Sequence, residues 1–341
     1  MVKANFFWHG SSLSLYERAC LSSFVQNGFD VRLHSFDLGL ELPDGTTLVD
    51  ARGLAKPEEI DLRTQGGQKG CLASFSNIYR YRLLSQEGGW WFDTDVFCLA
   101  DNEAFLEVQE HSPGISVGFE TETQLNGAVM YVSEPGFARE LEALAEAKGY
   151  VIGWGEIGPL LITEYYHAHR DRVAALPQEA FYPVLYSDIQ LLFDPDAKST
   201  CESAAAGSFC VHIHNTNRAA RGIPKDIMPC EGSYLEELFI SVGAETSTQA
   251  RLPIDVIRLR RKIETLEKSN ERCKQEMGLL RLDLAHLTGL QEKIDRIYAS
   301  RTWRLGSLFR KLAIPPLVLW RLGRRFSTKI KAEVARDRPG T

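Results

Sequence analysis

Residues 73–99 constrain the fold of this chain more than any other stretch. Apolar residues recur at helical spacing over residues 75–84, and the Gly88-Gly89 pair that follows is typical of the end of a helix. Residues 90–92, Trp-Trp-Phe, form a short bulky run, typical of a strand covered on both of its faces. The sequence therefore predicts a helix, a tight turn and a central strand, in that order.

Two acids, Asp93 and Asp95, follow this strand directly. In an extended segment, side chains at positions i and i+2 point to the same side. Carboxylate oxygens suit Mg²⁺ or Mn²⁺, so the two acids can share one divalent cation. The alternative is a turn with solvated acids, since an isolated D-x-D pattern is common by chance. The paired glycines, the aromatic strand and Tyr79-Arg80 just upstream favour the metal interpretation.

This region resembles the nucleotide-sugar glycosyltransferases with a DXD sugar-binding region (family 32), which include α-1,4-galactosyltransferases, fungal initiating mannosyltransferases and bacterial capsule enzymes. The matching motifs are Ser76-Asn77, Arg80-Tyr81, Gly88-Gly89 and Asp93-Thr94-Asp95. The chain departs from the family at Asn77, where Asp is usual, and at Trp91, where Tyr is usual. Asn77 can hydrogen-bond a sugar hydroxyl but brings no charge, so the identity of the donor sugar stays open.

The N-terminal part predicts a strand over residues 4–8, a helix over 14–24 and a strand over 30–36. Such a βαβ unit implies a parallel sheet, in which ligands bind at the carboxyl ends of the strands. Trp8, His9 and Gly10 occupy that position, and the resemblance implies a nucleotide there. Core packing of Trp8 is an equal alternative. We expect residues 40–70, which are polar and rich in Gly and Pro, to form a mobile segment.

Two further strands are predicted over residues 115–119 and 128–132, with a polar loop over 120–126 that reaches towards the same edge. Asn126 looks like the asparagine that the family places near the donor sugar. Residues 154–159, WGEIGP, resemble the family's T-G-P motif, with only Gly158-Pro159 matching strictly. Glycines there let the backbone approach a ligand, although a Gly-Pro turn before a helix is also an ordinary structural device.

The segment VHIHN at residues 211–215 is similar to the family's V-H-L-W-N, with His214 in place of Trp. In an extended segment His212 and His214 point together. Imidazole combined with carboxylate suits Mn²⁺, so we predict His212 as the third metal ligand beside Asp93 and Asp95. The alternative for a single histidine is a satisfied core group. Residues 181–183, FYP, also match the family and are expected to be architectural.

The resemblance implies a GT-A type, Rossmann-like α/β domain with a mixed, mostly parallel sheet, which we place at residues 1–250. It further implies a retaining transfer that depends on Mn²⁺ (or Mg²⁺). Asp93, Asp95, Asn126 and Glu156 form the predicted catalytic set, and Glu120 and Glu156 are the candidates for a nucleophile. The residues predicted to contact the donor or acceptor are Trp8, His9, Gly10, Asn77, Arg80, Gly158, His214 and Asn215.

A heptad pattern runs through residues 254–299 and predicts a two-stranded coiled coil, hence a homodimer. Asn270 at an a-type position favours two strands in register. A single long helix packed on the body is the alternative. The predicted seam consists of Val256, Leu259, Ile263, Leu266, Asn270, Cys273, Met277, Leu280, Leu284, Leu287, Gln291, Ile294 and Tyr298.

The formal net charge of −6 conceals a basic tail, because residues 301–331 hold nine Lys or Arg and no acid. The remainder carries 30 basic against 45 acidic residues, which argues against nucleic-acid binding by the body. Residues 300–331 alternate aromatic, aliphatic and basic side chains, which suits an anionic membrane surface; docking on another protein is the alternative. We expect residues 332–341 to be a disordered tail.

Seven scattered cysteines without a CxxC pair indicate a reducing compartment. The start MVKANFFWHG has no signal-like pattern, and no apolar run approaches the ~20 residues of a spanning helix. We therefore expect a cytoplasmic enzyme, peripheral on the inner face of the cytoplasmic membrane. It would use a nucleotide-sugar donor (UDP- or GDP-sugar) and a glycan or lipid-linked acceptor in bacterial surface polysaccharide synthesis.

Two other classes stay open. A metal-dependent phosphodiesterase would also use clustered acids, but normally needs a second acidic cluster, which the sequence does not offer. A catalytically inactive coiled-coil scaffold of a polysaccharide assembly complex is the other class. The intact set Asp93, Asp95 and His212 argues against the scaffold.

Overall fold

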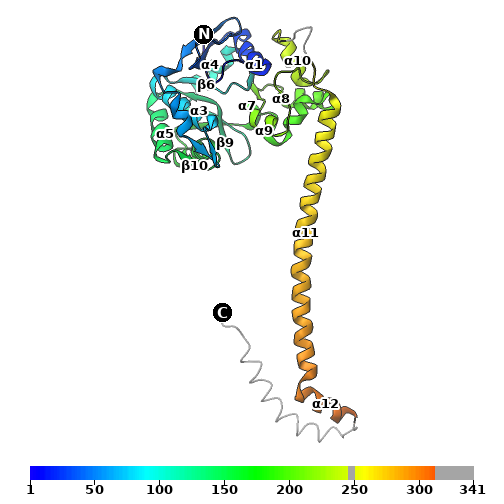
Figure 1. Ribbon diagram of the computed structural model, residues 1–341. Helices are drawn as coiled ribbons and strands as arrows, with labels where there is room; N and C mark the ends of the chain where they lie inside the picture. Colours follow the sequence, from blue (N-terminus) through cyan, green and yellow to red (C-terminus); the bar gives the residue numbers. More distant parts are fainter. Residues whose placement is uncertain (245–249, 312–341) are drawn as a thin grey trace. The chain divides into compact units, whose positions relative to one another are not determined.

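The computed structural model describes residues 1–244 and 250–311, with side chains as far as residue 308. It divides into a first unit, Met1–Ile263, and a second unit that begins at Glu264 (Figure 1). Most of the predicted membrane-associating segment and the whole predicted tail at residues 332–341 lie outside the described residues.

A seven-stranded sheet organises the first unit, in the order β11-β8-β9-β6-β1-β2-β3. Every neighbouring pair is parallel except the two that involve β9, which is antiparallel to both β8 and β6. The predicted α/β class with a mixed, mostly parallel sheet is therefore confirmed. The strands are β1 (Lys3–Trp8), β2 (Asp30–Ser35), β3 (Thr46–Asp50), β6 (Gly89–Phe92), β8 (Ile115–Phe119), β9 (Leu125–Val132) and β11 (Val173–Leu176).

Helices cover both faces of this sheet, as the apolar run at β6 predicted. Trp91 faces a core formed with α3 (Leu72–Glu87), α5 (Pro135–Ala147) and α6 (Pro159–Ala168). Trp90 and Phe92 face the opposite core, to which α1 (Leu15–Gln26) and α4 (Asn102–Glu110) contribute. Figure 1 shows α3 and α5 packed side by side on their face. Side chains of a strand alternate between faces, so all three aromatic residues are buried.

The ends of the helices follow the local sequence. Ser14 and Glu17 form a capping box at the start of α1, so two backbone N–H groups that lack helical partners are satisfied. Gly88 ends α3 with a positive φ of 64°, a conformation that glycine adopts without strain. The turn between α3 and β6 therefore forms where the glycine pair predicted it.

The strand directions bring distant residues to one edge of the sheet. The carboxyl ends of β1, β6 and β8 share this edge, because these strands run the same way. The amino end of β9 lies there too, because β9 runs in the opposite direction. Asp93, Glu120 and Asn126 therefore meet at one edge of the sheet.

A third core lies beside the sheet, around the antiparallel pair β7 (Val96–Cys98) and β12 (Cys210–His212). Phe97 and Val211 point into this core, which also takes residues from α1 and from the start of α11. The other elements of this region are α7 (Gln178–Phe181), η2 (Tyr186–Phe193), η3 (Pro195–Ala197), α8 (Lys198–Ala205), α9 (Asn215–Ala220) and α10 (Tyr234–Ser241).

Residues 40–70 contain more regular structure than the sequence suggested. The edge strand β3 pairs with β2 over five residues, from Thr46 to Asp50. The remaining elements are η1 (Ala51–Gly53), α2 (Glu58–Leu62), β4 (Thr64–Gln65), β5 (Gln68–Lys69) and the later strand β10 (Val151–Ile152), which pairs with β4. The polar composition reflects an edge position: three residues of β3 are only half-buried and two are exposed.

The predicted long helix is present as α11 (Ile254–Ala299), followed by α12 (Arg301–Lys311). Whether α11 pairs with a second copy stays a prediction. Among the described residues, no helix combines the length and the apolar character that crossing a bilayer requires.

The buried histidine His34 in β2 generates a pH prediction. Its Nδ1 lies 3.1 Å from the Tyr79 hydroxyl and its Nε2 lies 3.4 Å from Asn5 Oδ1, a pattern that suits the neutral ring. Burial, assisted by the charge of Arg32, lowers the pKa of His34 to about 4.

The unfolded chain therefore binds a proton at His34 near pH 6.5, whereas the folded chain does so only near pH 4. We expect the free energy of unfolding to fall by about 3 kcal/mol from this group as the pH drops through that window. Denaturant titrations should show this slope for the wild type and for the exposed-site control His167→Gln, and a shallower one for His34→Gln. Equal slopes for all three proteins would contradict the assignment.

Candidate active site

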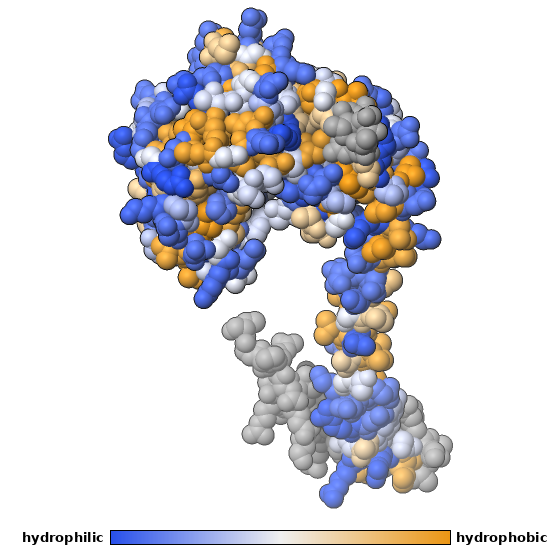
Figure 2. Space-filling view, turned by 45° about the horizontal axis from the view of Figure 1, so that its top comes forward, coloured by the Kyte–Doolittle hydropathy of each residue, from blue (hydrophilic) through white to orange (hydrophobic). Residues whose placement is uncertain are grey.

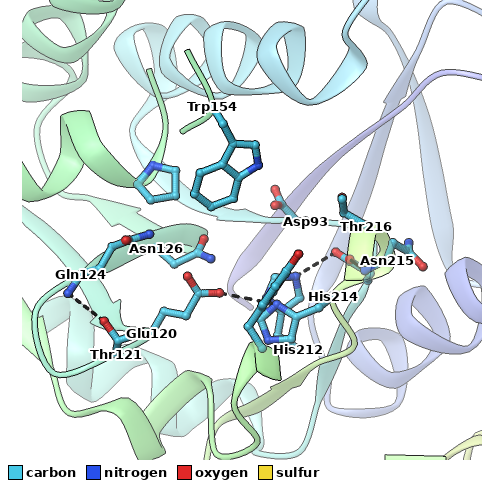
Figure 3. Close-up of a pocket in the computed structure, with 13 residues that line it drawn as sticks. Asp93, Glu120, Thr121, Gln124, Asn126, Trp154, His212, His214, Asn215 and Thr216 are labelled. Carbon is cyan, nitrogen blue, oxygen red and sulfur yellow. Dashed lines mark hydrogen bonds and ion pairs between the residues drawn. The ribbon is translucent and has the colours of Figure 1, made fainter. Parts of the chain in front are cut away.

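Two acids and one histidine converge at the sheet edge just described. Asp93 and Asp95 follow β6, and His212 ends β12. One ligand atom from each lies within 4.8 Å of the others. Residues about 120 positions apart are joined here because β7, which follows Asp95, pairs with β12. All three residues line a cavity, in which Figure 3 shows Asp93 and His212.

The carboxylate of Asp93 is held by two donors. Trp91 Nε1 and Arg80 Nη2 each lie 2.7 Å from the same oxygen, Oδ1. The Arg80 side chain is almost fully buried, and its Nη1 also donates to Asn77 Oδ1 at 3.0 Å. The second oxygen of Asp93 takes no part in these bonds. The N–H of the buried Trp91 therefore orients the first acid of the D-x-D motif.

Asp95 is buried and satisfied by the β12 segment. Its Oδ2 accepts the backbone N–H of Asn215 at 2.7 Å, and its Oδ1 lies 3.2 Å from His212 Nε2. Burial alone would raise the pKa of the Asp95 carboxyl, yet the charge of His212 and these hydrogen bonds hold the pKa well below its ordinary value. Burial likewise opposes protonation of His212, but Asp95 raises the pKa of the ring. Each group therefore favours the charged form of the other.

His214 occupies a strained position beside this pair. Among the described residues it is the one non-glycine with a positive φ, 53°. Its ring lies 3.9 Å from that of His212, measured between centroids, and its Nδ1 lies 3.5 Å from Glu120 Oε1. Burial, together with the charge of His212, lowers the pKa of His214 well below its ordinary value. His214 is therefore neutral at pH 7.

These groups line a cavity of about 320 Å³, within the size range of small-ligand sites. Trp154 lies across the cavity from Glu120 and His214 (Figure 3). The lining residues are Asp93, Asp95, Glu120, Thr121, Gln124, Asn126, Trp154, Pro159, Tyr186, His212, His214, Asn215 and Thr216. An adjoining cavity shares Asp93, Asn126, Trp154 and His212, and adds Asn77 and Arg80.

The donor set at this cavity fits a divalent cation. Asp93, Asp95 and His212 offer carboxylate oxygen and imidazole nitrogen, ligand types that Mn²⁺ accepts. The two carboxylates supply negative charge for the cation, and the His212 ring binds it once the ring has lost its proton. The structure brings together the three residues predicted as metal ligands, and their binding of a metal stays a prediction.

Several other predicted residues reach the same place. Asn126 lines both cavities, and its Oδ1 accepts the N–H of Ala128, which leaves its amide N–H₂ for a ligand. Asn77 packs against Gly158, where a Cβ would come 3.0 Å from the Asn77 amide. Gly158 therefore acts by allowing this close approach, and does not itself line either cavity as far as the described residues define them.

The three residues at the end of β1 lie to one side of the cavity. Trp8 donates from Nε1 to the Ser12 carbonyl, and the Lys225 ammonium sits 4.6 Å from its ring centroid. Trp8 is half-buried, so it is neither a fully buried core residue nor a fully exposed one. His9 is exposed, and Gly10 has a φ of 154°. Trp8, His9 and Gly10 therefore lie at the carboxyl end of β1 and do not belong to the metal-ligand cluster.

Glu156, predicted as catalytic, is not brought to the cavity with the other predicted residues. Its Oε2 accepts the backbone N–H of Gly153 at 2.7 Å, which closes the turn before α6. The carboxylate also lies 4.0 Å from Lys148. Neither cavity, within the part of the chain described, is lined by Glu156. The sequence placed it beside Gly158 correctly, but the turn directs its side chain back to its own backbone.

The sequence did not assign roles to five lining residues, Thr121, Gln124, Trp154, Tyr186 and Thr216. Trp154 is 61% exposed, the opposite of the buried Trp90 and Trp91. The signal that could have indicated a ligand contact was a tryptophan between two glycines, in the loop that precedes a helix. Tyr186 packs edge-on against His214, with their ring centroids 5.3 Å apart. It begins η2, a stretch of sequence that carries no motif.

Comparison with known proteins supports the resemblance. The family described as "Alpha 1,4-glycosyltransferase conserved region" matches residues 153–227, which include Trp154, Gly158, His212 and Asn215. Lactosylceramide 4-alpha-galactosyltransferase of Mus musculus is 27% identical over 164 residues, and that of Rattus norvegicus is 26% identical over 163. Each match covers 42% of this chain and 41% of the relative. The chain thus spans about two fifths of the length of these relatives.

The predicted resemblance to α-1,4-galactosyltransferases is therefore confirmed, and residues 153–227 match the conserved region of the alpha 1,4-glycosyltransferases. Among solved structures, the WbbM bifunctional glycosyltransferase is similar with a TM-score of 0.41 and 10% identity, covering 76% of this chain and 51% of that one. The glycosyltransferase GlyE of Streptococcus pneumoniae TIGR4 gives 0.40 and 12%, covering 77% and 64%. The fold class itself rests on the sheet described above.

The orientation of Asp93 by Trp91 can be tested with a matched pair of variants. Trp90 and Trp91 are both buried, but only Trp91 Nε1 bonds Asp93, whereas Trp90 Nε1 has no hydrogen-bond partner among the described residues. We expect Trp91→Phe to lower Mn²⁺ affinity about tenfold or more, as loss of an orienting bond does, and Trp90→Phe to leave it unchanged. Electron paramagnetic resonance of free Mn²⁺ measures both, and equal affinities for the two variants would refute the role.

Proposed function

We propose that this protein is a metal-dependent, retaining glycosyltransferase that uses a nucleotide-sugar donor. The observation that carries the proposal is the convergence of Asp93, Asp95 and His212 at the carboxyl edge of the sheet, beside a cavity of ligand size. The matched conserved region supports it, because that region supplies His212 and one wall of the cavity.

Asp93, Asp95 and His212 would hold Mn²⁺ or Mg²⁺, which when bound supplies Lewis-acid neutralisation of the leaving diphosphate. The chain's own residues do the rest of the positioning. Arg80 and Trp91 fix Asp93, and the Asn215 N–H fixes Asp95. Asn126, with a free amide N–H₂, offers donors for sugar hydroxyls.

The reaction breaks the bond between the anomeric carbon and the phosphate oxygen and forms a bond to an acceptor hydroxyl oxygen. The acceptor proton leaves with the phosphate oxygen, so atoms and charge balance without a further reactant. Retention of configuration, implied by the family, gives an α-linked product. We assign no nucleophile. Glu120 is a carboxylate on the cavity wall that does not belong to the set Asp93, Asp95 and His212, and it faces His214.

We also propose that the acceptor is a glycan or a lipid-linked glycan of bacterial surface polysaccharide synthesis, reached from the cytoplasmic face of the membrane. The support is the combination of the glycosyltransferase region with a basic, aromatic C-terminal segment. The galactosyltransferase relatives carry a lipid in their name, lactosylceramide, which agrees with an acceptor held at a membrane surface.

Incubation of the full chain with a panel of UDP- and GDP-sugars and Mn²⁺ tests the proposal. We expect slow release of nucleoside diphosphate from one donor, with water as acceptor, and an α-configured sugar by proton NMR. Asp95→Asn should lower the rate by at least about 100-fold, because the cation loses a charged ligand. The exposed control Asp171→Asn should keep it. Release of a nucleoside monophosphate would identify a phosphodiesterase instead, and no release from any donor would favour a scaffold.

We further propose that α11 forms a parallel, two-stranded coiled coil with a second copy. Most apolar seam residues are exposed in the single chain, including Leu266, Leu280 and Leu284 at 60–66% exposure. Apolar side chains are visible along this helix between charged ones (Figure 2). A helix with so many exposed leucines in one heptad register is stabilised by burying them against an equivalent helix.

Cys273 gives a direct test of register. All seven cysteines are described, and six of them are buried while Cys273, a seam residue, is exposed. In a parallel, in-register pair Cys273 faces its own equivalent. Mild oxidation should therefore convert the full chain to a disulfide-linked dimer, and Cys273→Ser should abolish the product. A dimer by light scattering that does not cross-link would argue for another register, and a monomer would refute the coiled coil.

The first part of the membrane segment, α12, exposes Trp303, Leu305 and Leu308 together with arginines. We propose that it lies on anionic lipid with its apolar side chains buried at the interface. The full chain should float with vesicles that contain phosphatidylglycerol and far less with neutral ones. A variant with Trp303, Leu305 and Leu308 all changed to Ser should stay in solution. Equal flotation of both proteins would contradict the proposal.

A further inference from the structure

A second set of metal-ligating side chains lies beside the first. Glu120, His212 and His214 offer one ligand atom each, and these atoms lie within 4.8 Å of one another. All three side chains are buried, with exposed fractions of 4–7%. They come from three segments: the end of β8, the end of β12 and the turn that begins α9. Figure 3 shows the Glu120 carboxylate directed at the two imidazoles.

The polar atoms of this cluster are incompletely paired. Within the described part of the chain, the buried His212 Nδ1 has no hydrogen-bond partner. Buried polar groups are nearly always paired, so this nitrogen beside Glu120 and His214 calls for a ligand that the chain does not supply. A nitrogen lone pair of a neutral imidazole is a ready metal ligand.

The backbone at His214 is strained to bring its ring to this place. A φ of 53° is uncommon at a residue with a Cβ and persists only where the surrounding structure holds it. The left-handed turn places the His214 ring 3.9 Å from that of His212 and its Nδ1 3.5 Å from Glu120. Strain of this kind concentrates at functional sites, and here it completes the cluster.

The donor chemistry differs from that of the first set. Two imidazoles and one carboxylate are a set that Zn²⁺ takes in proteins, with room left for a further ligand, whereas two carboxylates and one imidazole suit the harder Mn²⁺. Zinc holds nitrogen and oxygen ligands at about 2.0–2.2 Å, so neighbouring ligands lie roughly 3–3.5 Å apart. Glu120 Oε1 and His214 Nδ1 already have that separation, 3.5 Å.

We propose that Glu120, His212 and His214 form a second cation site that binds Zn²⁺, and that zinc there competes with manganese at Asp93, Asp95 and His212. Competition follows from two facts. His212 belongs to both sets, so one ion removes a ligand from the other. Two divalent cations a few ångströms apart also repel each other strongly in a buried site. The zinc site stands on its own residues; only the competition rests on the proposed function.

Zinc binding to the metal-free full chain, measured by calorimetry without manganese or donor, tests the site. Glu120→Gln and His214→Gln should each lower the Zn²⁺ affinity about tenfold or more. Removing a residue that only hydrogen-bonds a metal ligand already has an effect of that size, and these two residues would bind the metal directly. His167→Gln, an exposed histidine on α6, is the matched control and should bind zinc as the wild type does.

Manganese binding to the same variants separates a lost site from a damaged fold. His214 is outside the manganese set, so His214→Gln should keep the Mn²⁺ affinity of the wild type while losing zinc. Added Zn²⁺ should release bound Mn²⁺ from the wild type, seen as a growing signal of free Mn²⁺. Zinc affinity unchanged in Glu120→Gln and His214→Gln would overturn the site, as would equal loss of both metals in these variants. Zinc binding without release of manganese would overturn the competition.

Discussion

The buried carboxylate of Asp95 is the contact on which the rest of the site depends. Removed from water, it must be charged and paired or it would protonate. The chain pairs it with the His212 ring and the Asn215 N–H, and the Asp95 carbonyl accepts the N–H of Ile213. These bonds fasten the end of the central strand β6 to a segment 120 residues later. The contacts that pack β12 into the third core therefore also bring the three metal-ligand residues together.

The sheet explains why so many polar groups meet at that point. Because β9 runs against its neighbours, the edge that carries the carboxyl ends of β6 and β8 also carries the amino end of β9. Acids, amides and histidines from four segments thus surround one cavity. The apolar residues of the same strands face two helix-covered cores, so the polar cluster rests on a rigid base.

Much of this was predictable from the sequence, for local reasons. The Gly88-Gly89 pair and the aromatic run predicted the turn and β6. The two acids were predicted in an extended segment, but they lie in a turn that the Val96 N–H closes by donating to the Asp93 carbonyl. His212 was predictable because a family motif carries it. The strand β3 was not predicted, since an edge strand with one solvated side lacks a strong apolar pattern. The placement of Glu156 was not predictable, because spacing does not tell whether a carboxylate accepts a hydrogen bond from its own turn.

Other features depend on tertiary contacts that no local pattern encodes. The left-handed turn at His214 and its approach to Glu120 arise where β12 ends against the loop after β8. The exposed Trp154 takes its place on the cavity wall through the packing of α6 against β9. The heptad pattern of α11 was evident in the sequence, and the helix is present. Its pairing with a second copy depends on contacts between two chains, which a pattern within one chain does not describe.

The most direct test of the central claim is anomalous diffraction at the manganese edge from crystals of the full chain grown with Mn²⁺ and a nucleoside diphosphate. The account predicts an anomalous peak bounded by carboxylate oxygens of Asp93 and Asp95 and a ring nitrogen of His212, with the diphosphate completing its coordination. A manganese peak at other residues, or a nucleotide bound away from this cavity, would contradict it.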